Sequence, residues 1–167
     1  MIPVNNFSKN NTRMEKIEIK LNTFLHKDII IDNSVTGLDT GGGHQAADPS
    51  IIWDPIKKRW LVYFFAVTNG FAEIYVAESN DLLNFRFIGK AVSKGSQEDF
   101  DNVYAHKPGA IFYDDLFYLF YSGDNGRSRS IGVAISRDGV NFTKNSNNPI
   151  LIGPEGTNYL GAPSIIR

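Results

Sequence analysis

The amino-acid sequence predicts an all-β protein built from β-propeller blades of four antiparallel strands, with two full blades plus the start of a third. Three observations predict this fold: an internal repeat of roughly 57–59 residues, short apolar runs bounded by turn residues, and many aromatic side chains. The 167 residues include 12 Phe, 7 Tyr and 2 Trp, and aromatic residues favour strands. The repeat is the strongest of the three, because it defines the unit of the fold.

The repeat consists of segments that recur in the same order. The paired segments are 48–54 with 107–113, 60–65 with 117–121, and 77–85 with 134–142. A third copy opens at 162–166, where Ala162-Pro163 stands in the place of Asp48-Pro49 and Lys107-Pro108. The repeat therefore predicts blade-like units at about 45–93 and 104–152, with a third beginning at about 159.

Each unit contains four strand candidates separated by turn residues. In the second unit the four strands are expected at about 108–113, 116–122, 130–136 and 141–144. Four short antiparallel strands in roughly 50 residues are typical of a propeller blade. The innermost strand of each blade should be apolar on both faces, as Ile51-Ile52-Trp53 and Ala110-Ile111-Phe112 are. A β-sandwich of eight or nine strands is the alternative, although it does not explain the repetition.

The N-terminal region precedes the repeats and differs from them in composition. Residues 1–13 are polar and rich in Asn, so we expect a flexible tail, with 14–167 forming the partial propeller. The alternating segment 16–21 and the apolar residues at 24–25 and 29–31 are candidates for outer strands of an incomplete preceding blade. No secretory signal is visible in this region, which leaves the cytoplasm as the default compartment.

Two blades and an opening strand do not close a ring, since propellers need about four or more blades. Three solutions are open: the chain is a piece of a longer protein, it forms a homo-oligomer that completes the propeller, or its blades pack as a compact half-propeller. In each of these three arrangements, further protein surface must cover the aromatic flanks of the blades, which would otherwise face water.

Composition excludes several classes of function. The formal charge of −1 argues against nucleic acid or an anionic membrane as a partner, and no apolar run is long enough to span a bilayer. Cys is absent, which excludes disulfides and thiolate metal sites. Three His residues without i,i+4 spacing make a protein-only zinc site a poor interpretation.

The motifs resemble the five-bladed propeller glycoside hydrolases, a superfamily that includes families 43, 32, 68, 117 and 130. The resemblance covers roughly residues 44–167 and depends on Ala47-Asp48-Pro49-Ser50, the aromatic second strands, and the Ser-x-Asp turns at Asp81 and Asp138. Tyr121-Ser122-Gly123 and the segment 131–139 are similar to the second blade of arabinosidase-like members. The resemblance implies an oligosaccharide or polysaccharide-derived substrate and no cofactor, although an axial ion occurs in similar enzymes.

In that superfamily the catalytic carboxylates lie where the innermost strands begin. Asp48 occupies the first such position, which the resemblance assigns to the general base of inverting members or the nucleophile of retaining ones. The second and third positions depart from the pattern, because Lys107 precedes Pro108 where an Asp is expected, and Gly161-Ala162-Pro163 has no carboxylate where the acid would precede Ala-Pro. A general acid would have to come from His106, from Glu155 or from a partner chain, or there is none.

Further residues are candidates for contacts with a sugar. His44 follows three glycines, and Lys107 would either bind an anionic sugar or phosphate or form an ion pair with Asp48. The loops between the second and third strands add Asn69 and Phe71 in one blade and Asp124 and Arg127 in the other. Flat aromatic faces and polar side chains of this kind suit a sugar ligand.

Each of these candidates also has a structural interpretation. An Asp before Pro caps turns, so Asp48 needs the resemblance before a catalytic role is favoured. Asp81 and Asp138 recur once in each blade, as turn formers do, and Trp53 and Trp60 are better explained by packing between blades.

Three hypotheses of function follow. The first is a glycoside hydrolase that depends on Asp48, and the second is a carbohydrate-binding or self-assembling module without the general acid. The third is a fragment that has no independent activity.

Overall fold

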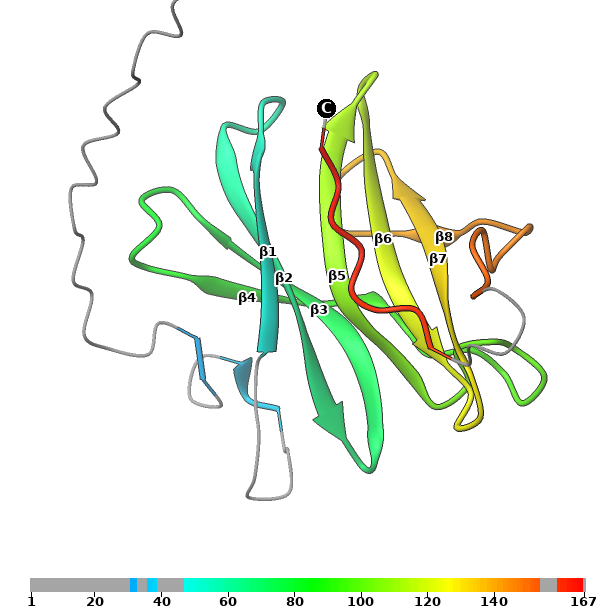
Figure 1. Cartoon of the computed structure of the whole chain (residues 1–167). Helices are drawn as coiled ribbons and strands as arrows, with labels where there is room; N and C mark the ends of the chain where they lie inside the picture. Colours follow the sequence, from blue (N-terminus) through cyan, green and yellow to red (C-terminus); the bar gives the residue numbers. More distant parts are fainter. Residues whose placement is uncertain (1–30, 33–35, 39–46, 154–158, 167) are drawn as a thin grey trace, which may run out of the picture.

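The structure is a computed structural model and describes residues 31–32, 36–38, 47–153 and 159–166. The expected tail at 1–13, the strand candidates between 16 and 30, His44 and Glu155 all lie outside these ranges. Eight strands within the described ranges form two antiparallel four-stranded blades, which stand beside each other (Figure 1). The predicted all-β fold and its incomplete propeller are confirmed.

The strands follow the repeat. Blade 1 consists of β1 (Ala47–Asp54), β2 (Arg59–Thr68), β3 (Phe71–Ser79) and β4 (Arg86–Val92). Blade 2 consists of β5 (Tyr104–Tyr113), β6 (Leu116–Asp124), β7 (Arg129–Ser136) and β8 (Thr143–Lys144). The first strand of the second blade begins earlier than the predicted 108, because Tyr104, Ala105 and His106 already pair with β6.

One backbone bridge connects each blade to the next. Ala72 near the start of β3 pairs in parallel with Tyr104 at the start of β5. The same parallel bridge recurs one repeat later between Arg129 and Tyr159. Residues 159–166 accordingly run beside β5 (Figure 1), in the place of the innermost strand of a third blade.

The main hydrophobic core fills the space between the two blades. The second strands of the two blades together supply five large members of this core, whose relative exposure is at most 1%. These members are Leu61, Tyr63, Phe117, Leu119 and Tyr121. Burying such large side chains provides the main free energy that holds the blades together.

The outer flank of blade 1 is covered only in part. Val62 and Phe64 are buried there and pack against Ile31 and Leu38. Ile51 and Trp53 on β1, by contrast, are 46% and 41% exposed. The innermost strand is therefore apolar on both faces, as predicted, but only one face is covered within the described ranges.

The same turn closes the third strand of both blades. In each, a Ser hydroxyl accepts two backbone N–H groups, an Asp carboxylate accepts two more, and an Asn side chain donates to that carboxylate. The three residues are Ser79, Asp81 and Asn84 in blade 1, and Ser136, Asp138 and Asn141 in blade 2. Asp81 and Asp138 therefore have the turn-forming place that their recurrence predicts.

None of the helical structure within the described ranges is long and apolar enough to cross a membrane.

Candidate functional site

The candidate site lies at the end of the molecule where β1 and β5 begin, which we call the mouth. Asp48 and Lys107 occupy equivalent places there, each just before a proline in a bulge of the innermost strand. Both have left-handed backbones, with φ of 48° and 52°. Proline has no N–H to donate to the sheet, which suits a bulge, and left-handed residues of this kind are frequent at functional sites.

The two side chains converge. The Lys107 Nζ atom lies 3.9 Å from an Asp48 Oδ atom, and the side chains are 33% and 49% exposed. This distance exceeds that of an ordinary hydrogen bond, so both groups keep hydrogen-bonding capacity for a ligand. The two side chains thus lie close to each other, in the arrangement expected of the ion pair predicted from the sequence.

The third equivalent position is open. Ala162 is exposed and offers only a methyl group. Its neighbour Gly161 has no atom within 4 Å of where a Cβ would stand. The carbonyl of Gly161 accepts a hydrogen bond of 3.1 Å from Ser122 Oγ, which fixes this segment against β6.

His106 is buried behind Lys107. It is 6% exposed and lies against the rings of Phe65 and Tyr104, with ring centroids 5.7 and 5.8 Å away. Its Nε2 atom has no hydrogen-bond partner among the residues that the structure describes. Burial, followed by the charges of Arg129 and Lys107, lowers the pKa of His106 to about 4. The imidazole is therefore neutral at pH 7, which suits a hydrogen bond to a ligand better than proton donation.

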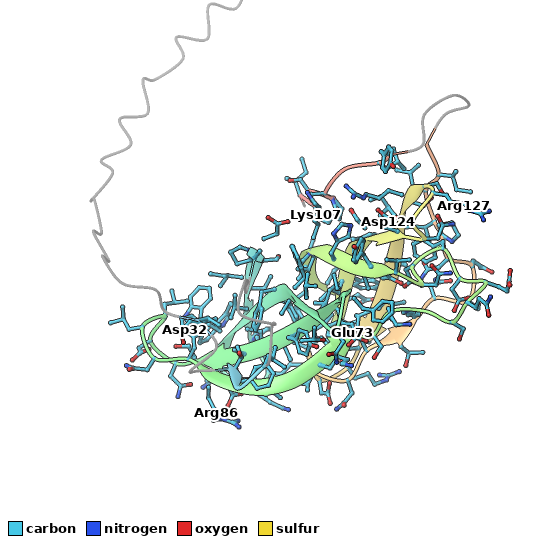
Figure 2. The ribbon with its side chains drawn as sticks, turned by 90° about the horizontal axis from the view of Figure 1, so that it is seen from below. Asp32, Glu73, Arg86, Lys107, Asp124 and Arg127 are labelled. Carbon is cyan, nitrogen blue, oxygen red and sulfur yellow. The ribbon has the colours of Figure 1, made fainter. Side chains whose placement is uncertain are left out.

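Asp124 and Arg127 have different surroundings. Asp124 is buried, accepts the Gly126 N–H at 2.7 Å and forms an ion pair of 3.1 Å with Arg129. Arg127 is exposed and lines a separate hollow of about 350 Å³ with Asp99 and other polar residues. Figure 2 views the mouth and shows Lys107, Asp124 and Arg127 in that order away from blade 1.

Asn69 and Phe71 lie in the β2–β3 hairpin. Asn69 and Gly70 both have positive φ, of 53° and 80°, as a tight two-residue hairpin turn requires. Phe71 is 40% exposed, and the Lys94 Nζ atom lies 4.5 Å from the centre of its ring. Both residues are at the mouth end of blade 1, but the structure gives neither a contact with Asp48 or Lys107.

Sequence reasoning missed Arg129 and Tyr159. The Arg129 guanidinium, held by Asp124, lies 5.5 Å from the centre of the exposed Tyr159 ring. Arg129 is the cross-strand partner of Asp124 in the β6–β7 hairpin. An Asp at the end of one predicted strand and an Arg at the start of the next were therefore the sequence features that could have indicated this pair. Tyr159 falls one repeat after Tyr104, which the repeat alone could have revealed.

No group of three His, Asp or Glu side chains converges as a metal site in the part of the chain that the structure describes.

Three solved structures with the same fold are each longer than this chain. The family 117 glycoside hydrolase Zg3597 from the marine bacterium Zobellia galactanivorans matches 73% of this chain and 45% of its own, with a TM-score of 0.61 and 17% identity. A thermostable family-43 glycoside hydrolase matches 67% of this chain and 40% of its own, with a TM-score of 0.56 and 26% identity. The GH32 β-fructofuranosidase BmSUC1 of Bombyx mori matches 73% and 27%, with a TM-score of 0.61 and 21% identity.

The chain has the fold of the five-bladed β-propeller glycoside hydrolases. It spans less than half the length of each of these three propeller proteins. No protein-family model and no curated protein matches the chain.

Proposed function

We propose that the mouth binds a carbohydrate, and that Asp48 is the general base or nucleophile in the hydrolysis of a glycosidic bond. One observation carries the proposal: Asp48 begins an innermost strand in a left-handed bulge and faces the equivalent residue of the next blade. The glycoside hydrolase fold places this proposal in a carbohydrate context.

Hydrolysis also needs a general acid. The two carboxyl groups of a glycosidase stand about 5–5.5 Å apart in retaining enzymes and about 6.5–9.5 Å apart in inverting ones. Lys107 and Ala162 at the equivalent positions supply none, and Asp124 is held by Arg129. Catalysis therefore requires an acid from residues outside the described ranges or from a further chain.

The second candidate function is a carbohydrate-binding module that does not catalyse. The observation that favours it is the replacement of two expected carboxylates by Lys107 and Ala162. In this case the mouth would bind a sugar through Asp48 and Lys107, and would release it unchanged.

Turnover of a panel of nitrophenyl glycosides by Asp48→Asn separates the two functions. Asp115→Asn is the matched control, because Asp115 lies in the exposed turn at the opposite end of β5. For an enzyme, Asp48→Asn lowers kcat at least about 100-fold and the control leaves it unchanged. Binding by the wild type without turnover indicates the module, and equal turnover by all three proteins removes Asp48 from the mechanism.

Light scattering tests whether copies of the chain complete the propeller. A homo-oligomer has a mass that is a multiple of 18.6 kDa, and we expect its turnover per chain to fall on dilution as it dissociates. A monomer that retains full turnover would overturn this part of the proposal.

A further inference from the structure

The Lys107 ammonium group has unused hydrogen-bonding capacity. Within the described ranges its one carboxylate neighbour is Asp48, at 3.9 Å, and no acceptor is bonded to its three N–H groups. Exposed ion pairs of this length contribute little free energy. A ligand that offers a closer anionic group can therefore bind Lys107 without disrupting a strong native contact.

There is space for such a group on the side of Lys107 that faces away from Asp48. The repeat places Lys107 between Asp48 of blade 1 and Ala162 of the third unit. Ala162 and Gly161 are both exposed, and no atom of the described residues lies within 4 Å of where a Gly161 Cβ would stand. An anionic group placed there would approach Lys107 with Asp48 on the far side of the ammonium.

The charges near the mouth also favour an anion. The buried His106 imidazole responds to four of them, and the charges of Arg129 and Lys107, which lower its pKa, outweigh those of Asp124 and Asp48, which raise it. Arg129 and Lys107 thus lie close enough to act on this imidazole, beside the carboxylates of Asp124 and Asp48. This response supports an anion preference that the positions of Lys107 and Ala162 already indicate.

We propose that the mouth selects sugars carrying an anionic group, a carboxylate or a sulfate ester, which binds Lys107 above Ala162. This inference rests on the proposed function, since it names the substrate class of the same site. Asp48 then faces the sugar ring rather than the anionic group. His106 lies behind Lys107 and stays neutral.

Calorimetric titration with matched pairs of sugars tests the proposal on the full chain. The pairs are glucuronic acid with glucose, galacturonic acid with galactose, and galactose 6-sulfate with galactose, and inorganic sulfate is titrated alone. In at least one pair we expect the anionic sugar to bind at least about tenfold more tightly than its neutral partner. A carboxylate is the source if a uronic acid shows this preference, and a sulfate ester if galactose 6-sulfate does.

Three variants assign the preference to Lys107. Lys107→Met should abolish it, Lys107→Arg should retain it, and Lys57→Met in the exposed turn at the far end of β1 should leave it unchanged. Asp48→Asn should bind the anionic sugar more tightly, because it removes a competing negative charge. This last variant keeps the proposal testable if Lys107→Met does not fold.

The results separate this inference from the proposed function. Equal binding of neutral and anionic sugars, weakened by Asp48→Asn, would leave the proposed function standing and overturn the anion preference. Inorganic sulfate that binds as tightly as the sulfated sugar would overturn the inference too, because the sugar would then contribute nothing. If no sugar binds, both proposals are wrong.

Discussion

The two blades agree closely at one end and differ at the other. Away from the mouth, the Ser-x-Asp turn repeats hydrogen bond for hydrogen bond in both blades. At the mouth, Ala47, Asp48 and Ser50 of blade 1 are replaced by His106, Lys107 and Gly109 in blade 2. The repeat therefore preserves the residues that shape a blade, and it varies those that would meet a ligand.

Even the shared turn differs in what surrounds it. The blade 2 turn packs into blade 1, where Arg59 and Tyr63 donate hydrogen bonds to the carbonyls of Asp138 and Gly139. In blade 1 the equivalent turn residues, Asp81 and Leu82, are exposed. One local structure thus has two different energetic environments.

Replacing Gly139 by Ala should give the largest effect. Gly139 has φ of 71°, and an added Cβ would lie 2.5 Å from the Leu61 side chain. Left-handed strain and overpacking should together reduce the free energy of unfolding by about 3 kcal/mol. Urea unfolding measures this change.

The reverse change at the equivalent position of blade 1 provides the comparison. Leu82 has a left-handed backbone with φ of 63° and is 36% exposed. Leu82→Gly relieves this strain and should change stability by less than about 1 kcal/mol. Equal losses in the two variants would show that the surroundings of the turn do not matter.

The stability of His106→Gln measured over a range of pH tests the difference between the blades at the mouth. His106 in blade 2 is equivalent to Ala47 in blade 1, which has no titratable side chain. Folding lowers the pKa of His106 from 6.5 to about 4, so the unfolded chain binds a proton more readily. Stability should therefore fall as the pH drops from 6.5 towards 4. Between pH 7 and pH 5 this group should contribute a loss of about 2 kcal/mol.

His106→Gln should lack that part of the loss, whereas the carboxylates contribute equally to both proteins. Urea unfolding at pH 7, 6 and 5 provides the comparison. Parallel pH profiles for wild type and variant would show that His106 titrates normally.

Removal of the turn carboxylates should give the smallest effects. Asp138→Ala leaves the Val140 and Asn141 N–H groups without their acceptor next to the blade interface, at a cost of about 1–2 kcal/mol. Asp81→Ala breaks the same bonds in water and should cost less. A thermal melt of each variant tests this order, and a larger drop for Asp81→Ala would contradict it.

Much of the fold could be predicted from the sequence because the repeat encodes it. Pro49, Pro108 and Pro163 mark the innermost strands, and the recurring Asp81 and Asp138 mark the turns that close each third strand. The early start of β5 at Tyr104 was missed, because the residues before Lys107 pair through their backbones and show no alternating pattern.

The site was less predictable. Asp48 and Lys107 could be placed together because the repeat makes them equivalent. The contact of Asp124 with Arg129, rather than with a ligand, depends on which residues face each other across the β6–β7 hairpin. The burial of His106 depends on packing against Phe65 of the other blade, which no local pattern encodes.

The parallel bridges between blades have a consequence for how the chain tolerates change. Ala72 with Tyr104, and Arg129 with Tyr159, tie each blade to the next at the mouth end. The connection from β4 to β5 also reaches this end, because Lys94 lies against Phe71 and the Val103 N–H donates to the Asp124 carbonyl at 3.0 Å. Backbone pairing does not depend on which side chain a residue carries, so the residues at these four bridging positions can change while the spacing of Asp48 and Lys107 is kept.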